Sequence, residues 1–260
     1  MRKYKHLVVA NWKMNPISPE EAKRLIRSTK KSAKELRRTE VVICPPYLYI
    51  PYVKFEPKAK YYLGVQDVFW QPSGTFTGEI SSEMVRQSGA KFVIVGHSER
   101  RGLGETDEII ARKLNAALAA GLTAILCVGE NSRDKDEGEY LEYLRKQISA
   151  SLSGVKKRFL TDLIIAYEPV WAISKGYGVS QAMKPEDVHE TALYIKKVLS
   201  EIFGKDWVSA VRILYGGSVG PDNAGFIVGG GGIDGLLVGR ESLNPESFNL
   251  LLKSVDAVPL

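Results

Sequence analysis

The stretch Leu163–Gly178, LIIAYEPVWAISKGYG, brings one carboxylate to the end of an apolar run. Residues 163–166 are all apolar, and Glu168 follows one position after Tyr167. Such a run is typical of a strand that is buried on both faces. The glycine-containing segment 174–178 has the composition of a loop that closes over a ligand. Glu168 is therefore a candidate functional acid, although an acid paired with Lys or Arg fits this stretch alone equally well.

Short apolar runs alternate with helical patterns along the whole chain. The runs predicted as strands are His6–Ala10, Val41–Cys44, Tyr61–Val65, Lys91–Val95, Thr123–Val128, Leu163–Tyr167, Val211–Leu214 and Ile233–Val238. The segments predicted as helices are Pro19–Arg37, Ile80–Ser88, Asp107–Ala120, Asp136–Leu152, Pro185–Phe203, Pro221–Val228 and Pro245–Ser254. Eight such units, about 30 residues apart, predict an α/β fold with a closed parallel (β/α)8 barrel as a single domain over residues 1–260. A doubly wound open sheet is the alternative, but no G-x-G-x-x-G motif follows the first strand.

Composition places the chain among ordinary globular proteins. Its 260 residues fit one α/β barrel, and 44% hydrophobic residues argue against disorder. The net charge of +6 is spread over helical faces such as 23–38, so we expect a solvated basic surface and no nucleic-acid partner. The apolar runs are too short for a membrane span or a signal peptide, which favours a cytoplasmic protein with no membrane partner. Cys44 and Cys127 each end an apolar run and are expected to be buried, reduced and without metal-ligand spacing.

Polar residues gather where the predicted strands end. They are Asn11 and Lys13 after the first strand, His97, Ser98 and Glu99 after the fourth, Glu168 after the sixth, Gly216-Gly217-Ser218 after the seventh and Gly239-Arg240 after the eighth. The carboxyl ends of the strands form one face of such a barrel, where its active sites lie. We therefore expect these residues to meet at one rim.

Each of these residues also has an ordinary interpretation. Lys13 alone is more often a surface lysine, His97 is equally well a structural histidine, and a glycine-rich turn is sometimes only a tight turn. His97 precedes the first turn of a predicted short helix, whose positive end favours a neutral imidazole that donates to a carbonyl oxygen. The turn at 216–218 precedes a predicted helix with Pro221 near its start, so its backbone N–H groups are suited to a phosphate.

Together these groups supply a base, a hydrogen-bond donor, a cation and a phosphate site. That set predicts proton abstraction next to a carbonyl in a small phosphorylated substrate. A barrel that binds a phosphorylated metabolite without catalysis is the alternative, although binding alone requires no base.

Six separated motifs resemble the triosephosphate isomerase family, in that family's order and across essentially the whole chain. They are NWKMN at 11–15, GHSERR at 96–101, CVGE at 127–130, AYEPVWAI at 166–173, YGGSV at 215–219 and DGLLVG at 234–239. The resemblance implies a TIM barrel and an intramolecular oxidoreductase of glycolysis and gluconeogenesis. It also implies that dihydroxyacetone phosphate and D-glyceraldehyde 3-phosphate interconvert through an enediolate, without a cofactor or metal.

The resemblance also implies roles for individual residues. Glu168 would move the proton, His97 would polarise the carbonyl, and Glu99 would orient Lys13. Asn11 and Lys13 would bind the substrate and stabilise its negative charge. The backbone amides implied to hold the phosphate are those of Ser174, Ser218, Gly239 and Arg240. Tyr215 would pack against the lid.

The loop at 64–78 carries Phe69, Trp70, Phe76 and Thr77. Loops of this length are usually functional, and we expect its aromatic residues to be exposed and in need of cover. It resembles the family's interface loop, which inserts into a second subunit near Asn11 and Lys13. The resemblance therefore implies a homodimer.

The chain departs from the family pattern at two places. The lid runs from 173 to 183 before Lys184-Pro185-Glu186 and looks about three residues longer than is usual in the family. Arg240 stands where the family commonly has a second glycine. If that position required a left-handed backbone, Arg would cost about 1 kcal/mol. We expect its side chain to point to solvent, with a charge added near the phosphate as the alternative.

Overall fold

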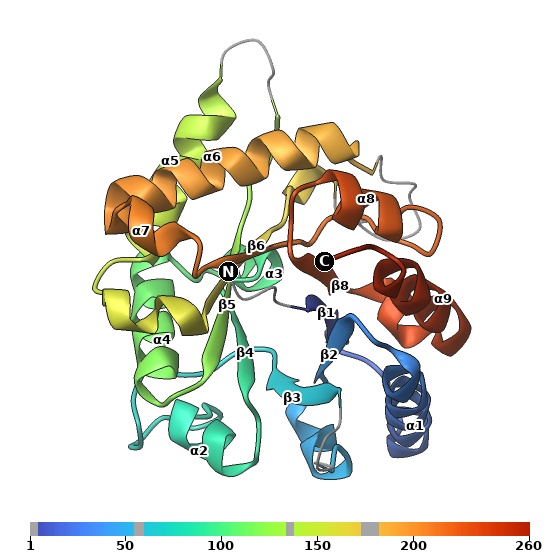
Figure 1. Cartoon of the computed structure of the whole chain (residues 1–260). Helices are drawn as coiled ribbons and strands as arrows, with labels where there is room; N and C mark the ends of the chain where they lie inside the picture. The colour runs from blue at the N-terminus through green and yellow to red at the C-terminus, as the bar shows by residue number, and fades with distance from the viewer. Residues whose placement is uncertain (1–4, 55–59, 134–137, 173–181) are drawn as a thin grey trace.

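In the part of the chain that the computed structural model describes, residues 5–54, 60–133, 138–172 and 182–260, eight parallel strands form a closed barrel (Figure 1). The strands are β1 (His6–Asn11), β2 (Thr39–Cys44), β3 (Tyr61–Val65), β4 (Phe92–Val95), β5 (Thr123–Val128), β6 (Leu163–Tyr167), β7 (Arg212–Tyr215) and β8 (Gly235–Val238). Each strand pairs with the next, and β8 closes the barrel on β1 through pairs such as Val8 with Leu236. The predicted closed barrel is confirmed, and the open-sheet alternative is wrong.

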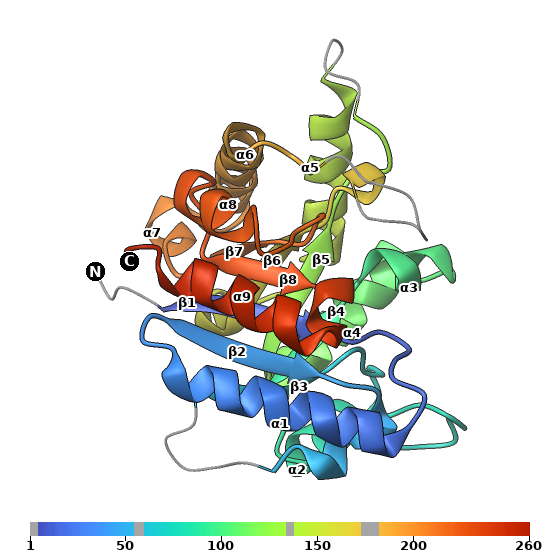
Figure 2. The same cartoon turned by 90° about the vertical axis from the view of Figure 1, so that its right-hand side faces the viewer.

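Helices surround the strands, as Figures 1 and 2 show. The α-helices are α1 (Pro19–Glu35), α2 (Ser82–Gln87), α3 (Ser98–Gly102), α4 (Asp107–Ala119), α5 (Glu139–Ser151), α6 (Pro185–Phe203), α7 (Lys205–Val208), α8 (Ala224–Gly230) and α9 (Pro245–Asp256). The 3-10 helices are η1 (Tyr47–Tyr52), η2 (Lys157–Asp162), η3 (Val170–Ala172) and η4 (Arg240–Leu243). Local sequence explains the start of α1, because the Ser18 side chain accepts a hydrogen bond from Glu21 N and Pro19 fits the first turn.

One predicted helix begins later than expected. The segment predicted from Pro221 is helical only from Ala224, because Asn223 Oδ1 accepts a hydrogen bond from Gly220 N at 2.8 Å and fixes a turn before the helix. Pro221 therefore lies in this turn and not at the start of α8. The glycine-rich turn at 216–218 does not open directly into a helix, which corrects the prediction.

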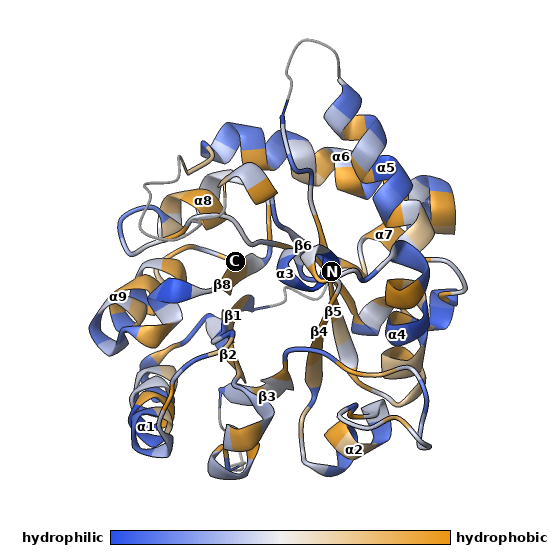
Figure 3. Ribbon diagram, turned by 180° about the vertical axis from the view of Figure 1, so that it is seen from behind, coloured by the Kyte–Doolittle hydropathy of each residue, from blue (hydrophilic) through white to orange (hydrophobic). Residues whose placement is uncertain are grey.

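The barrel interior and the layer between strands and helices are two separate apolar cores. Alternate residues of each strand point into the barrel, so Leu7 and Val9 pack with Cys44 and Cys127 inside it, whereas Val8 packs toward the helices. Figure 3 shows this apolar character along β4 and β5. Both cysteines are buried free thiols, as predicted, and burial raises the pKa of each. Among the described helices, none is long and apolar enough to cross a membrane.

Candidate active site

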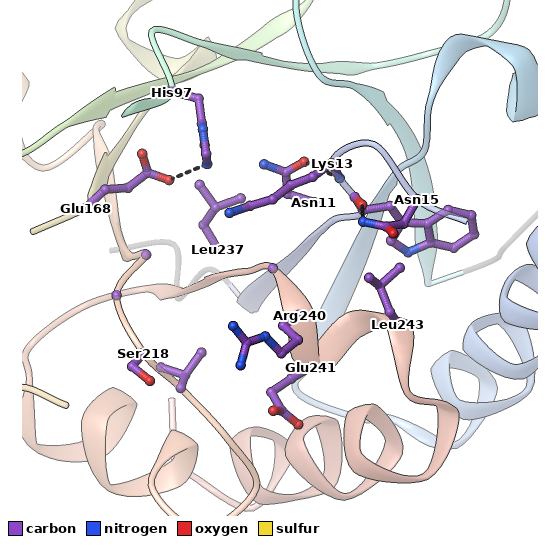
Figure 4. A pocket seen from close by; sticks show the side chains of 15 residues that line it. Asn11, Lys13, Asn15, His97, Glu168, Ser218, Leu237, Arg240, Glu241 and Leu243 are labelled. Carbon is purple, nitrogen blue, oxygen red and sulfur yellow. Dashed lines mark hydrogen bonds and ion pairs between the residues drawn. The ribbon is translucent and has the colours of Figure 1, made fainter. Parts of the chain in front are cut away.

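A cavity of about 260 Å³ opens at the carboxyl ends of the strands (Figure 4). It brings together residues predicted from five different strand ends. Those lining it are Asn11, Lys13, His97, Glu168, Ser218, Gly239 and Arg240. Glu99 lines a second cavity that shares Lys13 and Glu168 with the first. Ser174 lies outside the described residues, as does most of the predicted lid. Every predicted site residue that the structure describes thus lies at one end of the barrel.

Glu168 is a buried acid, with only 2% of its surface exposed. It follows β6, and its backbone N–H donates to Val128 O at 2.7 Å, which extends the strand pairing to this residue. Its Oε1 lies 3.2 Å from Nε2 of His97, and its Oε2 accepts a hydrogen bond from Ser98 N at 3.3 Å. The partners described for this carboxylate are an imidazole, a backbone amide and the thiol of Cys127. The described partners of this carboxylate include no Lys or Arg, and Lys175 of the predicted lid lies outside the described residues.

His97 forms the N-cap of α3, directly after β4 and Gly96. Its Nδ1 accepts a hydrogen bond from Glu99 N at 3.2 Å. An acceptor nitrogen carries no hydrogen, so the ring hydrogen of a neutral imidazole is on Nε2, which faces Glu168. In Figure 4 the ring points from above toward the space between Glu168 and Lys13. The start of a short helix thus fixes which nitrogen can donate into the cavity.

Lys13 has a left-handed backbone, with φ of 53°, and is the one described residue other than glycine with positive φ. Its Nζ lies 2.8 Å from Glu99 Oε1, so the structure places the Glu99 carboxylate on the lysine amine. Its backbone N–H donates to Asn11 Oδ1 at 3.1 Å. A Cβ at Gly239 would lie 3.3 Å from Lys13 Cε, so a glycine there leaves room for the lysine stem.

Arg240 begins η4; it is exposed and also lines the cavity, so the choice between a side chain in solvent and a charge near the phosphate stays a prediction. In Figure 4 its guanidinium lies on the same side of the cavity as Ser218. Its backbone is not left-handed, so the strain considered for an arginine at this position is absent.

Sequence reasoning missed a buried acid that contacts β6 and η3, the segment before the predicted lid. Glu130 is 1% exposed, and its Oε1 accepts hydrogen bonds from the hydroxyl of Tyr167 at 2.8 Å and from Trp171 Nε1 at 2.9 Å. The motif CVGE at 127–130 contained the signal, because its acid also follows a strand. Tyr215 is buried next to Tyr167, with ring centroids 6.3 Å apart, and burial raises its pKa to about 12.

The aromatic residues of the loop after β3 are less exposed than expected. Phe69 is buried, and its ring centroid lies 4.0 Å from that of Trp70 and 4.7 Å from that of Phe76. The expectation that all three are exposed is wrong, because they cover one another. Phe76 and Thr77 remain exposed.

Metal-binding side chains do not cluster in the described ranges. No group of three or more His, Cys, Asp and Glu residues there is arranged to hold a metal ion.

Comparison with known proteins gives a consistent match. A family model described as triosephosphate isomerase matches residues 6–255. The chain belongs to the triosephosphate isomerase family. Its relatives include the triosephosphate isomerases of Roseiflexus sp. (strain RS-1), 40% identical over 98% of this chain and 98% of the relative, and Dictyoglomus thermophilum, 39% identical over 95% and 98%. That of Thermoanaerobacter pseudethanolicus is 38% identical over 93% of this chain and 96% of its own length. The match to the family model includes all eight strands of the barrel and the residues that line the cavity at its mouth.

Proposed function

We propose that this protein interconverts dihydroxyacetone phosphate and D-glyceraldehyde 3-phosphate, with Glu168 as the base. The observation that supports this role best is the position of its buried carboxylate, 3.2 Å from an imidazole nitrogen at the cavity wall. The activity is that of an isomerase, an intramolecular oxidoreductase that acts in glycolysis and gluconeogenesis. The reaction moves one proton between neighbouring carbons and another between the two oxygens that these carbons carry, so the molecule undergoes no net oxidation.

Glu168 removes the proton from the carbon next to the carbonyl and returns it to the adjacent carbon. His97 donates its Nε2 hydrogen to the substrate oxygen and so stabilises the charge that forms in the enediolate. The Lys13 ammonium, held by Glu99 at 2.8 Å, adds a positive charge on the same side. The side-chain oxygen of Asn11 accepts a hydrogen bond from Lys13 N, so the amide hydrogens of Asn11 can donate to the substrate.

The phosphate binds at the other side of the cavity. The backbone N–H groups of Ser218, Gly239 and Arg240 are suited to it, and that of Ser174 completes the set when the lid closes. Small residues at 216, 217 and 239 let the backbone approach the substrate closely.

A coupled assay with glyceraldehyde 3-phosphate tests this proposal, with Glu168→Gln as the comparison. The substitution keeps the shape of the side chain but removes the base, so kcat should fall about 1,000-fold while KM changes little. A wild-type protein that binds triose phosphate without turnover would instead support the non-catalytic barrel.

We also propose a homodimer formed by the loops after β1 to β4. Large apolar side chains are exposed there, including Met14 (92%), Ile17 (97%), Leu48 (80%) and Leu103 (79%). These loops follow neighbouring strands, so their exposed side chains share one side of the barrel mouth. The exposed tip at Phe76 and Thr77 would insert beside Asn11 and Lys13 of the second subunit. Exposed apolar surface of this kind is typical of an interface.

Sedimentation at micromolar concentration tests the dimer. Leu48→Lys should shift the protein toward monomer, whereas Leu250→Lys, at an exposed leucine on α9, should not. A monomeric wild-type protein at these concentrations would contradict the proposal. A cytoplasmic location and the absence of a nucleic-acid partner stay predictions, supported by the two buried free thiols and by the spread of basic residues.

A further inference from the structure

The left-handed backbone of Lys13 requires something to hold it. A residue with a Cβ avoids this conformation unless its surroundings stabilise it. The side-chain amide of Gln66 lies next to it: Nε2 donates one hydrogen bond to Lys13 O at 2.9 Å and another to Cys44 O at 2.9 Å. Both hydrogens of the amide are therefore used on backbone carbonyls.

These two bonds join three strand ends. Gln66 directly follows β3, Cys44 is the last residue of β2, and Lys13 comes two residues after β1. Trp12 N also donates to Cys44 O, at 3.2 Å, so the carbonyl of Cys44 is shared between Trp12 and Gln66. The path of the chain from Trp12 to Lys13 is thereby held against the ends of the two neighbouring strands.

The next residue along the chain, Asp67, belongs to a buried ion-pair network. Its carboxylate lies 2.6 Å from Lys113 Nζ and 3.0 Å from Arg100 Nη2. Both cations also contact Glu105, each at 2.6 Å. The Asp67 carbonyl also accepts a short hydrogen bond from the hydroxyl of Tyr47. The ion pairs and the hydrogen bond of Asp67 therefore fix the position of the segment that carries Gln66.

The same network reaches the other end of Lys13. Arg100 directly follows Glu99, whose carboxylate holds the Lys13 amine. Gln66 and Glu99 thus hold the carbonyl and the ammonium of one lysine, and the residues after them, Asp67 and Arg100, are ion-paired. This arrangement fixes the distance between the two points at which Lys13 is held.

We propose that Gln66 is a positioning residue for Lys13: its amide keeps the lysine backbone left-handed so that the ammonium meets both Glu99 and the substrate. This inference rests on the role proposed for Lys13 above. According to this inference, the positioning of Lys13 depends on the hydrogen-bond donors of residue 66 and not on the size of its side chain.

The test compares Gln66→Met and Gln66→Glu with the wild type. Met has a similar length but no donor, and an ionised Glu has nearly the same shape but only acceptors facing two carbonyls. We expect both variants to raise KM about 10-fold and lower kcat about 10-fold, because misplacement of a binding group by about 1 Å costs roughly that much in total. Gln87→Met, at an exposed glutamine at the end of α2, is the matched control and should be unchanged.

The change in KM separates positioning from stability. A variant that is only less stable loses active protein, so its apparent kcat falls while KM stays as in the wild type. KM is measured at a protein concentration at which sedimentation shows the wild-type oligomeric state, and it can be measured on whatever fraction folds. If Gln66→Met does not fold, Gln66→Glu gives the same readout.

Lys13→Met shows whether the proposed function or the inference fails. If it loses activity while both Gln66 variants keep KM and kcat within about 2-fold of the wild type, positioning by Gln66 is overturned and the proposed function stands. If Lys13→Met is as active as the wild type, the role proposed for Lys13 is wrong and the inference falls with it. A Gln66→Glu variant of wild-type KM beside an impaired Gln66→Met would show that hydrogen-bond donation by residue 66 is not required, and would also overturn the inference.

Discussion

Gly216 lies so close to Glu168 that a Cβ at position 216 would be 2.7 Å from Cγ of the acid. The backbone at 216 is not left-handed, so alanine can adopt the same backbone conformation without strain. We expect Gly216→Ala to push the Glu168 side chain aside and to lower kcat/KM about 10- to 100-fold while the barrel stays folded. The coupled assay and circular dichroism measure the two effects.

Gly220→Ala is the matched control for this substitution. A Cβ at Gly220 would have no atom within 4 Å, and its backbone is not left-handed either. Full activity in Gly216→Ala would show that Glu168 does not need the position seen here.

Tyr215 makes stability depend on pH at the alkaline end. Burial raises its pKa from 10.0 to about 12, so between these values the unfolded chain loses a proton that the folded chain keeps. Its stabilising contribution is therefore complete below pH 10 and is lost as pH rises toward 12. As the pH rises over this range, the free energy of unfolding should fall less for Tyr215→Phe than for the wild type, by on the order of 2 kcal/mol. Urea unfolding at a series of pH values measures the difference, and parallel curves would contradict the prediction.

Asp256 makes stability depend on pH at the acid end. Burial alone would raise its pKa, but the backbone N–H groups of Arg37 and Arg38, which donate to its carboxylate, hold the pKa below 3.8. The contribution is present above 3.8 and is lost as pH falls through the lower folded value. Asp256→Ala should cost about 1 kcal/mol at neutral pH, because the carboxylate is only partly buried and solvent weakens its hydrogen bonds. Denaturant unfolding should show this cost shrink in acid, and a cost that is independent of pH would refute the assignment.

Lys113 is 2% exposed and lies between Asp67 and Glu105. Lys113→Met would leave two largely buried carboxylates with one fewer cation, so we expect a loss of about 3 kcal/mol in the free energy of unfolding. The matched control is Lys253→Met, which removes an exposed pair with Glu35 at 3.5 Å and should cost less than about 1 kcal/mol. Thermal unfolding of both variants gives the comparison, and equal losses would argue against a buried network.

Arg240→Gly tests whether the exposed guanidinium contributes to phosphate binding. An exposed charge contributes less than about 1 kcal/mol, so inhibition by inorganic phosphate should change by less than about 5-fold. A much weaker inhibition would show that the side chain, and not only the backbone amide, binds the anion.

The strands were predictable because burial on both faces leaves a continuous apolar run. β3, β5, β6 and α6 begin and end at the predicted residues. Most other boundaries moved by one to three residues, since terminal pairing such as Asn11 with Cys44 depends on the neighbouring strand and not on local composition. The start of α8 moved because one asparagine side chain formed a turn.

The residues that line the cavity could be predicted from the sequence, but their arrangement could not. A parallel barrel places all strand ends on one face, so Glu168, His97 and Lys13 could be brought together from their positions after strands. Nothing near Lys13 in the sequence indicates a left-handed backbone, because the groups that hold it, including Gln66, lie far away in the chain. Phe69 was misjudged for a similar reason, since its cover comes from Phe76 across the loop.

The closure of the barrel by β8 on β1 has a consequence for protein synthesis. Of the residues that line the cavity, Asn11 and Lys13 are among the first to be synthesised, and Gly239 and Arg240 are synthesised after Glu168 and Ser218. Until β8 is available, β1 lacks one of its two neighbours, and the side of the cavity that Gly239 and Arg240 line does not exist. We therefore expect a nascent chain that carries both Glu168 and Lys13 to stay inactive until the last strand pairs with the first.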